Sequence, residues 1–115
     1  MFRDGGILRI RDRHFYLLNY MDIKFSFIGW YLSNTSDKVW VSFLAEGVPY
    51  CAWGKRGAKL QFKQHNTWNK LRLVEKEKQK KYEPVDEFIL FSLFPDFKDR
   101  VKEELFISTL AGKVR

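Results

Sequence analysis

The sequence predicts an α+β domain: a twisted antiparallel β-sheet packed against one basic helix, with an additional C-terminal helix. Three observations lead to this prediction. Residues 39–44 alternate between two side-chain faces, and the reversal at residues 46–47 indicates that residues 48–53 return antiparallel. Residues 68–80 carry apolar side chains at helical spacing. Residues 95–105 open with Pro-Asp and then repeat a large apolar side chain every four residues, which is typical of a helix.

Length and composition favour a single globular domain over residues 1–115. Hydrophobic residues make up 45% of the chain and aromatic residues 17%, which is enough to form a core. The single cysteine, Cys51, has no partner for an internal disulfide and favours a reducing compartment. The chain shows no signal-peptide pattern and no apolar run long enough to span a bilayer. We therefore expect no membrane association and an intracellular location, in the cytoplasm or in the nucleoid or nucleus.

The same patterns indicate the other elements. Residues 7–20 have the pattern of one or two short strands. Residues 23–32 have that of a further strand, in which Phe25 and Phe27 are expected to share one face. The Asn-Thr pair at residues 66–67 offers N-caps for the basic helix.

The most apolar run is residues 88–94, and its periodicity fits either a buried strand or part of a helix. The C-terminal tail that contains this run either completes the core or forms a surface for a partner. We favour a role in the core.

An aromatic side chain, two glycines and three cations stand next to each other between two predicted strands. Gly54 and Gly57 permit a sharp turn that would hold Trp53, Lys55 and Arg56 at the edge of the sheet. A flat ring beside cations suits a nucleic-acid backbone or an unstacked end. The alternative is a Gly-rich hairpin whose Trp simply packs on the sheet.

The positive charge is concentrated in one part of the chain. The net charge is +7, but residues 53–82 hold ten Lys or Arg against two Glu, a net +8. This concentration suggests a patch that attracts a polyanion, and the alternative is a solvated helix face with spare lysines. Strand alternation places Lys59, Gln61 and Lys63 on one face. Helical spacing aligns a basic stripe of Arg72, Lys76 and Lys80.

The stretch from Trp53 to Gln61 resembles the signature of WGR domains, which is Trp-Gly-Arg, a variable residue, Gly, two variable residues and Gly-Gln. Trp53, Gly54, Gly57 and Gln61 match at the same spacing. The segments 36–40 and 75–82 are also similar to the opening strand and to the end of the helix in that family. The signature Arg is Lys55 here, and the signature Gly that directly precedes the Gln is Leu60.

The resemblance covers about residues 31–86. The predicted strands within residues 7–30 precede this WGR-like core, and a hydrophobic extension, residues 87–115, follows it. WGR domains occur in poly(ADP-ribose) polymerases that respond to DNA damage and in small stand-alone bacterial proteins. The resemblance therefore implies DNA binding near strand ends or breaks in a DNA-repair setting, with Trp53 stacked on a sugar and Lys55 in the position of the contacting Arg. Lys lacks the planar two-pronged geometry of Arg, which weakens that contact.

We therefore predict a non-catalytic nucleic-acid-binding module. The sequence contains no phosphate-binding loop, zinc motif or nucleophile elbow, so we expect no enzymatic activity, metal or cofactor. The alternatives are RNA binding and a protein partner or homodimer held by the segment from Phe88 to Phe97. The residues predicted to contact DNA ends, nicks or backbone are Trp53, Gly54, Lys55, Arg56, Gly57, Lys59, Gln61, Lys63, Arg72, Lys76 and Lys80.

Overall fold

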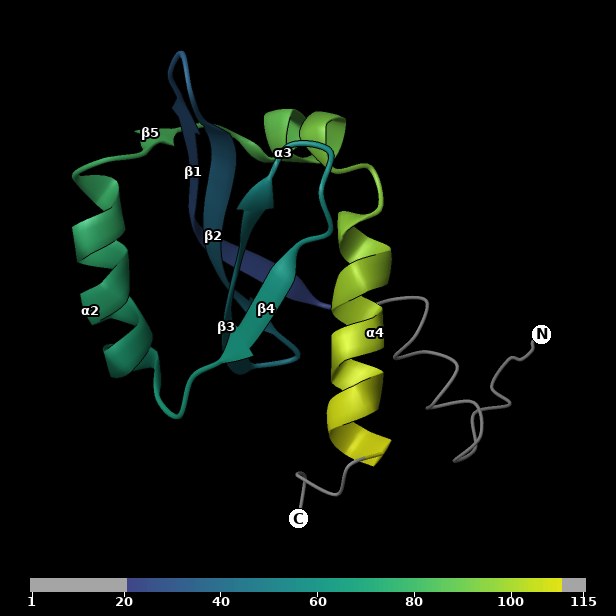
Figure 1. Cartoon of the computed structure of the whole chain (residues 1–115). Helices are drawn as coiled ribbons and strands as arrows, with labels where there is room; N and C mark the ends of the chain where they lie inside the picture. Colours follow the sequence, from purple (N-terminus) through teal and green to yellow (C-terminus); the bar gives the residue numbers. More distant parts are fainter. Residues whose placement is uncertain (1–20, 111–115) are drawn as a thin grey trace.

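The computed structural model describes residues 21–110, which form one five-stranded antiparallel sheet and three helices (Figure 1). The strands lie in the order β4-β3-β2-β1-β5. The predicted α+β class with a twisted antiparallel sheet is confirmed, and the strands predicted in residues 7–20 lie outside the described residues. In chain order the elements are β1 (Ile23–Leu32), β2 (Asp37–Ala45), β3 (Val48–Lys55), β4 (Gln61–Gln64), α2 (Trp68–Gln79), β5 (Glu83–Pro84), α3 (Glu87–Leu93) and α4 (Phe97–Leu110).

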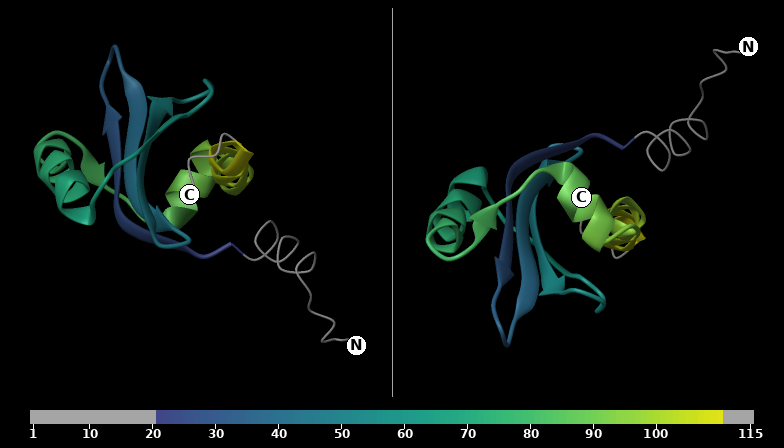
Figure 2. Two further views of the ribbon diagram at one scale, coloured as in Figure 1. Left: turned by 90° about the horizontal axis from the view of Figure 1, so that it is seen from below. Right: turned by 90° about the horizontal axis from the view of Figure 1, so that it is seen from above.

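The helices cover both faces of the sheet. Helix α2 lies against one face, and α3 and α4 lie against the other (Figure 2). Two separate apolar clusters result, one on each side of the strands. The alternation predicted for β2 holds: Val39, Val41 and Phe43 point to the α3–α4 side. Trp40 belongs to the cluster on the α2 side, so β2 is buried on both faces.

Strand β1 departs from the predicted alternation at a β-bulge. Between Phe25 and Phe27 the register shifts, because Phe25 pairs with Phe43 whereas Phe27 pairs with the adjacent Ser42. Phe25 therefore packs in the α3–α4 cluster and Phe27 in the α2 cluster. The prediction that these two rings share a face is wrong, since the extra residue of a bulge turns the following side chain to the opposite face.

The β2–β3 hairpin forms where the turn residues predict it. Glu46 and Gly47 have φ angles of 52° and 80°. Two successive positive φ angles match the right-handed twist of the flanking strands, which is why two-residue hairpins use them. Strand β3 then returns antiparallel along β2, as predicted.

The C-terminal tail completes the core on the α3–α4 side. Residues 88–93 of the apolar run are helical and Phe94 caps the helix; Leu90, Phe94, Phe97 and Val101 are all buried in the cluster on this side of the sheet. Helix α4 is also fixed by Arg100, which donates to the Leu60 carbonyl oxygen at 2.9 Å.

Helix α2 begins at its predicted cap and is anchored on the sheet by a buried carboxylate. The Thr67 hydroxyl accepts a hydrogen bond from the Lys70 amide at 3.1 Å. Glu75 is 2% exposed and accepts hydrogen bonds of 2.6 Å from the hydroxyls of Ser26 and Ser42. Arg72 on the same helix lies 3.3 Å from the second carboxylate oxygen. These contacts satisfy a charge that would otherwise be costly to bury.

Candidate nucleic-acid interface

Both glycines of the signature stretch have a local structural cause. Gly57 has a φ of +85°, which side chains rarely adopt, and it lies in the tight connection between β3 and β4. Gly54 lies in β3, and a Cβ atom there would come within 3.1 Å of the Leu60 side chain. The sharp turn predicted from these residues is therefore present, and Leu60 is packed underneath it.

The sheet register aligns the aromatic and basic side chains of this region on the α2 side. Trp53 is paired with Trp40 of β2 and with Gln61 of β4. Because residues two apart on a strand share a face, Lys55 and Lys63 lie on the same side as Trp53. Leu60 and Phe62 instead join the opposite cluster. The structure therefore has the predicted alternation, with Gln61 and Lys63 on one face and Leu60 and Phe62 on the other.

Two adjoining hollows open on this side, between α2 and the strands β3 and β4. The larger, about 420 Å³, is called here the lysine hollow, and the smaller, about 230 Å³, the aromatic hollow. Trp53, Lys78 and Tyr82 line both of them. The other residues that line the lysine hollow are Lys38, Val39, Gly54, Lys55, Ala58, Lys59 and Gln61. The aromatic hollow is completed by Trp40, Cys51, Lys63 and His65.

The charge of the two hollows has one sign. Five lysines line them, and none of the described residues in either lining is an Asp or a Glu. These lysines come from β2, β3, the β3–β4 connection, β4 and α2. A hollow lined by one sign of charge, with low-dielectric walls, concentrates field lines and raises the local concentration of counter-ions. The site is therefore suited to a polyanion.

The sequence-predicted residues divide into two groups. Trp53, Gly54, Lys55, Lys59, Gln61 and Lys63 line the hollows. The fold does not bring the other predicted residues, Arg56, Gly57, Arg72, Lys76 and Lys80, into either lining.

Arg56 is held on the opposite side of the sheet from Trp53. Its guanidinium lies 3.4 Å from the Asp37 carboxylate and 5.8 Å from the centre of the Trp30 ring. Trp30 in turn donates to Asp37 at 2.7 Å and packs in the α3–α4 cluster. The guanidinium therefore belongs to an intramolecular ion pair, and its side chain is 53% exposed.

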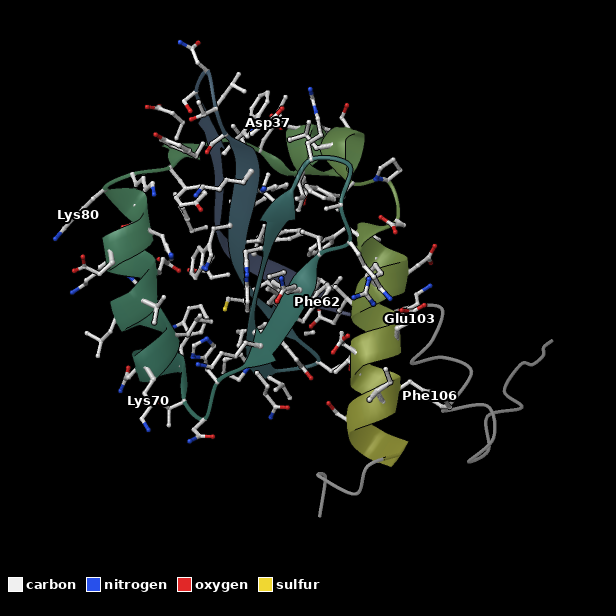
Figure 3. All side chains as sticks on the ribbon, viewed as in Figure 1. Asp37, Phe62, Lys70, Lys80, Glu103 and Phe106 are labelled. Atoms are coloured by element: carbon white, nitrogen blue, oxygen red, sulfur yellow. The ribbon has the colours of Figure 1, made fainter. Side chains whose placement is uncertain are left out.

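The basic stripe of α2 faces solvent. Arg72, Lys76 and Lys80 are exposed, and Lys80 points away from the sheet (Figure 3). Arg72 pairs with Glu75, and Lys80 lies 3.4 Å from Glu77. This stripe adds to the positive potential of the molecule without lining the hollows.

Eight of the lining residues were not predicted as site residues, and Lys38, Lys78 and Tyr82 are the most informative of them. Lys78 follows Leu71 by seven residues, so it extends the buried stripe of α2 towards the hollows. This spacing is present in the sequence and would have identified it. Lys38 stands two residues before Trp40 on the same face of β2. Its position across from Lys55, however, depends on the register of the two strands.

The close contact between strand β1 and Tyr82 requires a glycine at position 29. A Cβ atom on Gly29 would come within 2.5 Å of the Tyr82 Cβ atom. Tyr82 is 7% exposed, and its ring centre lies 6.0 Å from that of Tyr31. Gly29 thus lets the chain after α2 lie directly on the sheet, which positions the wall shared by the two hollows.

The floor of the aromatic hollow contains a thiol beside an imidazole. The Cys51 sulfur lies 3.3 Å from His65 Nε2. Burial raises the pKa of Cys51 to about 11, although Lys63 and Lys78 oppose the shift. Burial and the neighbouring Lys63 lower the pKa of His65. At neutral pH the pair is therefore a thiol and a neutral imidazole, which is unsuited to nucleophilic attack because the thiolate is the reactive form.

Comparison with protein-family models, with curated proteins and with solved structures gave no match. Within residues 21–110 there is no group of three or more His, Cys, Asp or Glu side chains that could hold a metal ion. Every helix in the same range is too short or too polar to cross a membrane.

Proposed function

We propose that this protein is a non-catalytic DNA-binding module that uses the lysine and aromatic hollows as its binding site. One observation carries the proposal: five lysines from different elements converge on Trp53, and no carboxylate is present among the described residues of the two linings. Lysines attract phosphates, and an aromatic ring beside them offers a surface on which a base or sugar can stack.

The arrangement of these lysines disfavours a purely structural explanation. Lysines on a solvated face are normally spaced apart or mixed with acids, because like charges directly opposite each other in a sheet destabilise it. Here Lys38 and Lys55 are paired across two strands, and Lys59 and Lys78 line the same hollow. An anionic ligand would relieve this repulsion.

The resemblance to WGR domains supports the same proposal. The two residues that it assigns to DNA contact, Trp53 and Lys55, both line the lysine hollow. We therefore propose a small WGR-like module that binds DNA ends, nicks or backbone in a DNA-repair setting. Lys55 would contact phosphate as a point charge, because it lacks the planar fork of the family's Arg.

The protein-partner alternative is less favoured. In the segment from Phe88 to Phe97, Leu90, Phe94 and Phe97 are buried in this chain's own core. Phe88, at 77% exposed, and Ile89, at 36%, are the large apolar side chains of the segment that stay accessible among the described residues. This leaves a small surface for a stable interface, since specific interfaces bury roughly 800 Å² on each partner.

The test is fluorescence anisotropy with labelled intact duplex, nicked duplex, single-stranded DNA and RNA across a salt series. We expect DNA binding whose log affinity falls linearly with log salt, because Lys contacts to phosphates release counter-ions. A preference for nicked or ended DNA that survives moderate salt supports the WGR-like interpretation. If the protein binds RNA more tightly than DNA, the ligand is RNA and the DNA proposal is wrong. No binding to any nucleic acid would overturn the proposal and leave the protein-partner alternative.

A further inference from the structure

We infer that the aromatic hollow takes one unpaired nucleobase, while the phosphates beside that base lie on the lysine hollow. The inference rests on the proposed function and makes it more specific. It assigns the two hollows different parts of the same nucleotide strand. The ligand is then a strand with an accessible base, such as a bulge, a gap or a single-stranded segment, and not a fully paired duplex.

The lining of the aromatic hollow supplies the surfaces that a base requires. Trp40 and Cys51 are each 3% exposed and contribute apolar surface at its base. Trp53 and Tyr82 line it as well. Stacking on aromatic rings tolerates every base, because each of the four has a π-face.

Polar groups are placed where the edge of a base can use them. His65, Lys63 and Lys78 line the aromatic hollow together with its rings. The ammonium groups donate hydrogen bonds, and the neutral His65 imidazole donates from one nitrogen and accepts at the other. A flipped or unpaired base is typically held in this manner, by stacking on rings and by hydrogen bonds to its edge.

The volume of the hollow fits a single heterocycle. Sites for drug-sized ligands range from about 300 to 1,000 Å³. The aromatic hollow, at about 230 Å³, lies below this range. It therefore suits one planar ring system and excludes a stacked base pair.

The two hollows adjoin each other, as a base and its backbone phosphates do in a nucleotide strand. Trp53, Lys78 and Tyr82 belong to both linings. The cations Lys38, Lys55 and Lys59 lie only in the larger hollow. A strand that places a base against Trp53 thereby brings its phosphates within reach of these three lysines.

The test compares two bulged duplexes that differ only in one base. One carries a single unpaired thymidine, and the other carries an abasic residue at the same position. Charge and backbone shape are matched, so the difference in anisotropy-derived Kd reports the base alone. We expect the abasic duplex to bind about tenfold more weakly, as for the loss of one stacked base. Equal Kd values would overturn the inference while leaving DNA binding intact.

A crosslinking measurement on the unmodified protein locates the base. The unpaired thymidine is replaced by 5-iodo-2′-deoxyuridine, which crosslinks to nearby aromatic side chains under long-wavelength light. Peptide mapping by mass spectrometry is expected to find the crosslink on Trp40, Trp53 or Tyr82. A crosslink confined to residues outside the aromatic hollow would overturn the inference.

A pair of Trp variants separates the hollow from general packing. Trp53→Leu is expected to abolish the discrimination between the thymidine and abasic bulges. Trp68→Leu is the matched control, because Trp68 packs in the same cluster as Trp53 but lines neither hollow. Loss of discrimination in both variants would contradict a role specific to Trp53. Failure of every probe to bind would overturn this inference together with the proposed function, whereas equal binding of the two bulges overturns this inference alone.

Discussion

Lys38 on β2 and Lys55 on β3 are directly paired across the sheet, and both line the lysine hollow. The Lys38 ammonium lies 5.5 Å from the centre of the Tyr31 ring, and the negative face of an aromatic ring attracts a cation. The ring carries no formal negative charge, however, so it does not neutralise the lysine. Paired cations on neighbouring strands weaken a fold, because they repel at close range. A bound anion would offset this repulsion, which gives the lysine pair a role in binding.

Replacing one member of this pair should therefore strengthen the fold and weaken the complex. For Lys55→Gln we expect the free energy of unfolding to rise by about 0.2–1 kcal/mol, the range measured for cross-strand pairs. DNA affinity should fall in the same variant. Urea denaturation and anisotropy measure the two effects separately. Lys76→Gln is the control, since Lys76 is on the exposed side of α2. A Lys55→Gln protein that is less stable than the original would contradict the repulsion.

The contribution of a lysine on α2 to DNA affinity should depend on whether the lysine lines the hollows. Lys78 lines both hollows, whereas Lys80 points to solvent and lies beside Glu77. We expect Lys78→Ala to weaken DNA binding several-fold more than Lys80→Ala does. Lys78→Ala should also reduce the slope of log Kd against log salt by about 1, as expected for one lost phosphate contact. Equal losses in the two variants would indicate a diffuse basic surface in place of a site.

Much of the fold was predictable because its signals are local. The period of two in β2, the Glu46-Gly47 turn and the Thr67 cap each depend on neighbours in sequence, and each is found as predicted. The run 88–94 was ambiguous because apolar residues on all sides fit a buried helix and a buried strand alike. The bulge in β1 was missed because large apolar side chains stand on both sides of Ser26, so the sequence does not show where the register shifts.

The candidate site was predictable only where it lies on one strand or turn. Trp53 and Lys55 were predicted from the glycine turn, and Lys63 from strand alternation after it. Lys38 and Tyr82 depend on which strands pair and on how α2 returns to the sheet, and these are relationships between distant parts of the chain. The basic stripe of α2 was the more conspicuous pattern, yet the stripe that contains Lys78 is the one that faces the sheet.

The buried carboxylate of Glu75 should be among the larger contributors to the attachment of α2. Glu75→Ala leaves the buried Ser42 hydroxyl without its acceptor and removes a charge-assisted network, so we expect a loss of about 3 kcal/mol in the free energy of unfolding. Glu75→Gln should cost less, because an amide oxygen still accepts. Glu77→Ala on the same helix serves as the control, because the Glu77 side chain is 71% exposed. This substitution should change the free energy of unfolding by less than about 0.5 kcal/mol. Urea denaturation of the three variants makes the comparison.

The stability and the DNA affinity of the protein should respond to pH in opposite directions through His65. Burial and Lys63 lower the pKa of His65 in the folded state, so the unfolded chain binds the proton more readily near its ordinary pKa of about 6.5. The free energy of unfolding should therefore decrease as pH falls from about 7.5 through 6.5. Lys63, Lys78, Cys51 and Tyr82 line the same hollow, and burial raises the pKa of Cys51 and of Tyr82, away from this interval. Bound phosphate opposes the effect of Lys63 and favours protonated His65, so DNA affinity should rise as pH falls. Urea denaturation and anisotropy at the two ends of this interval test both trends. In His65→Gln the pH dependence of the free energy of unfolding and that of the DNA affinity should both become smaller. An unchanged pH dependence in that variant would assign the effect to another group.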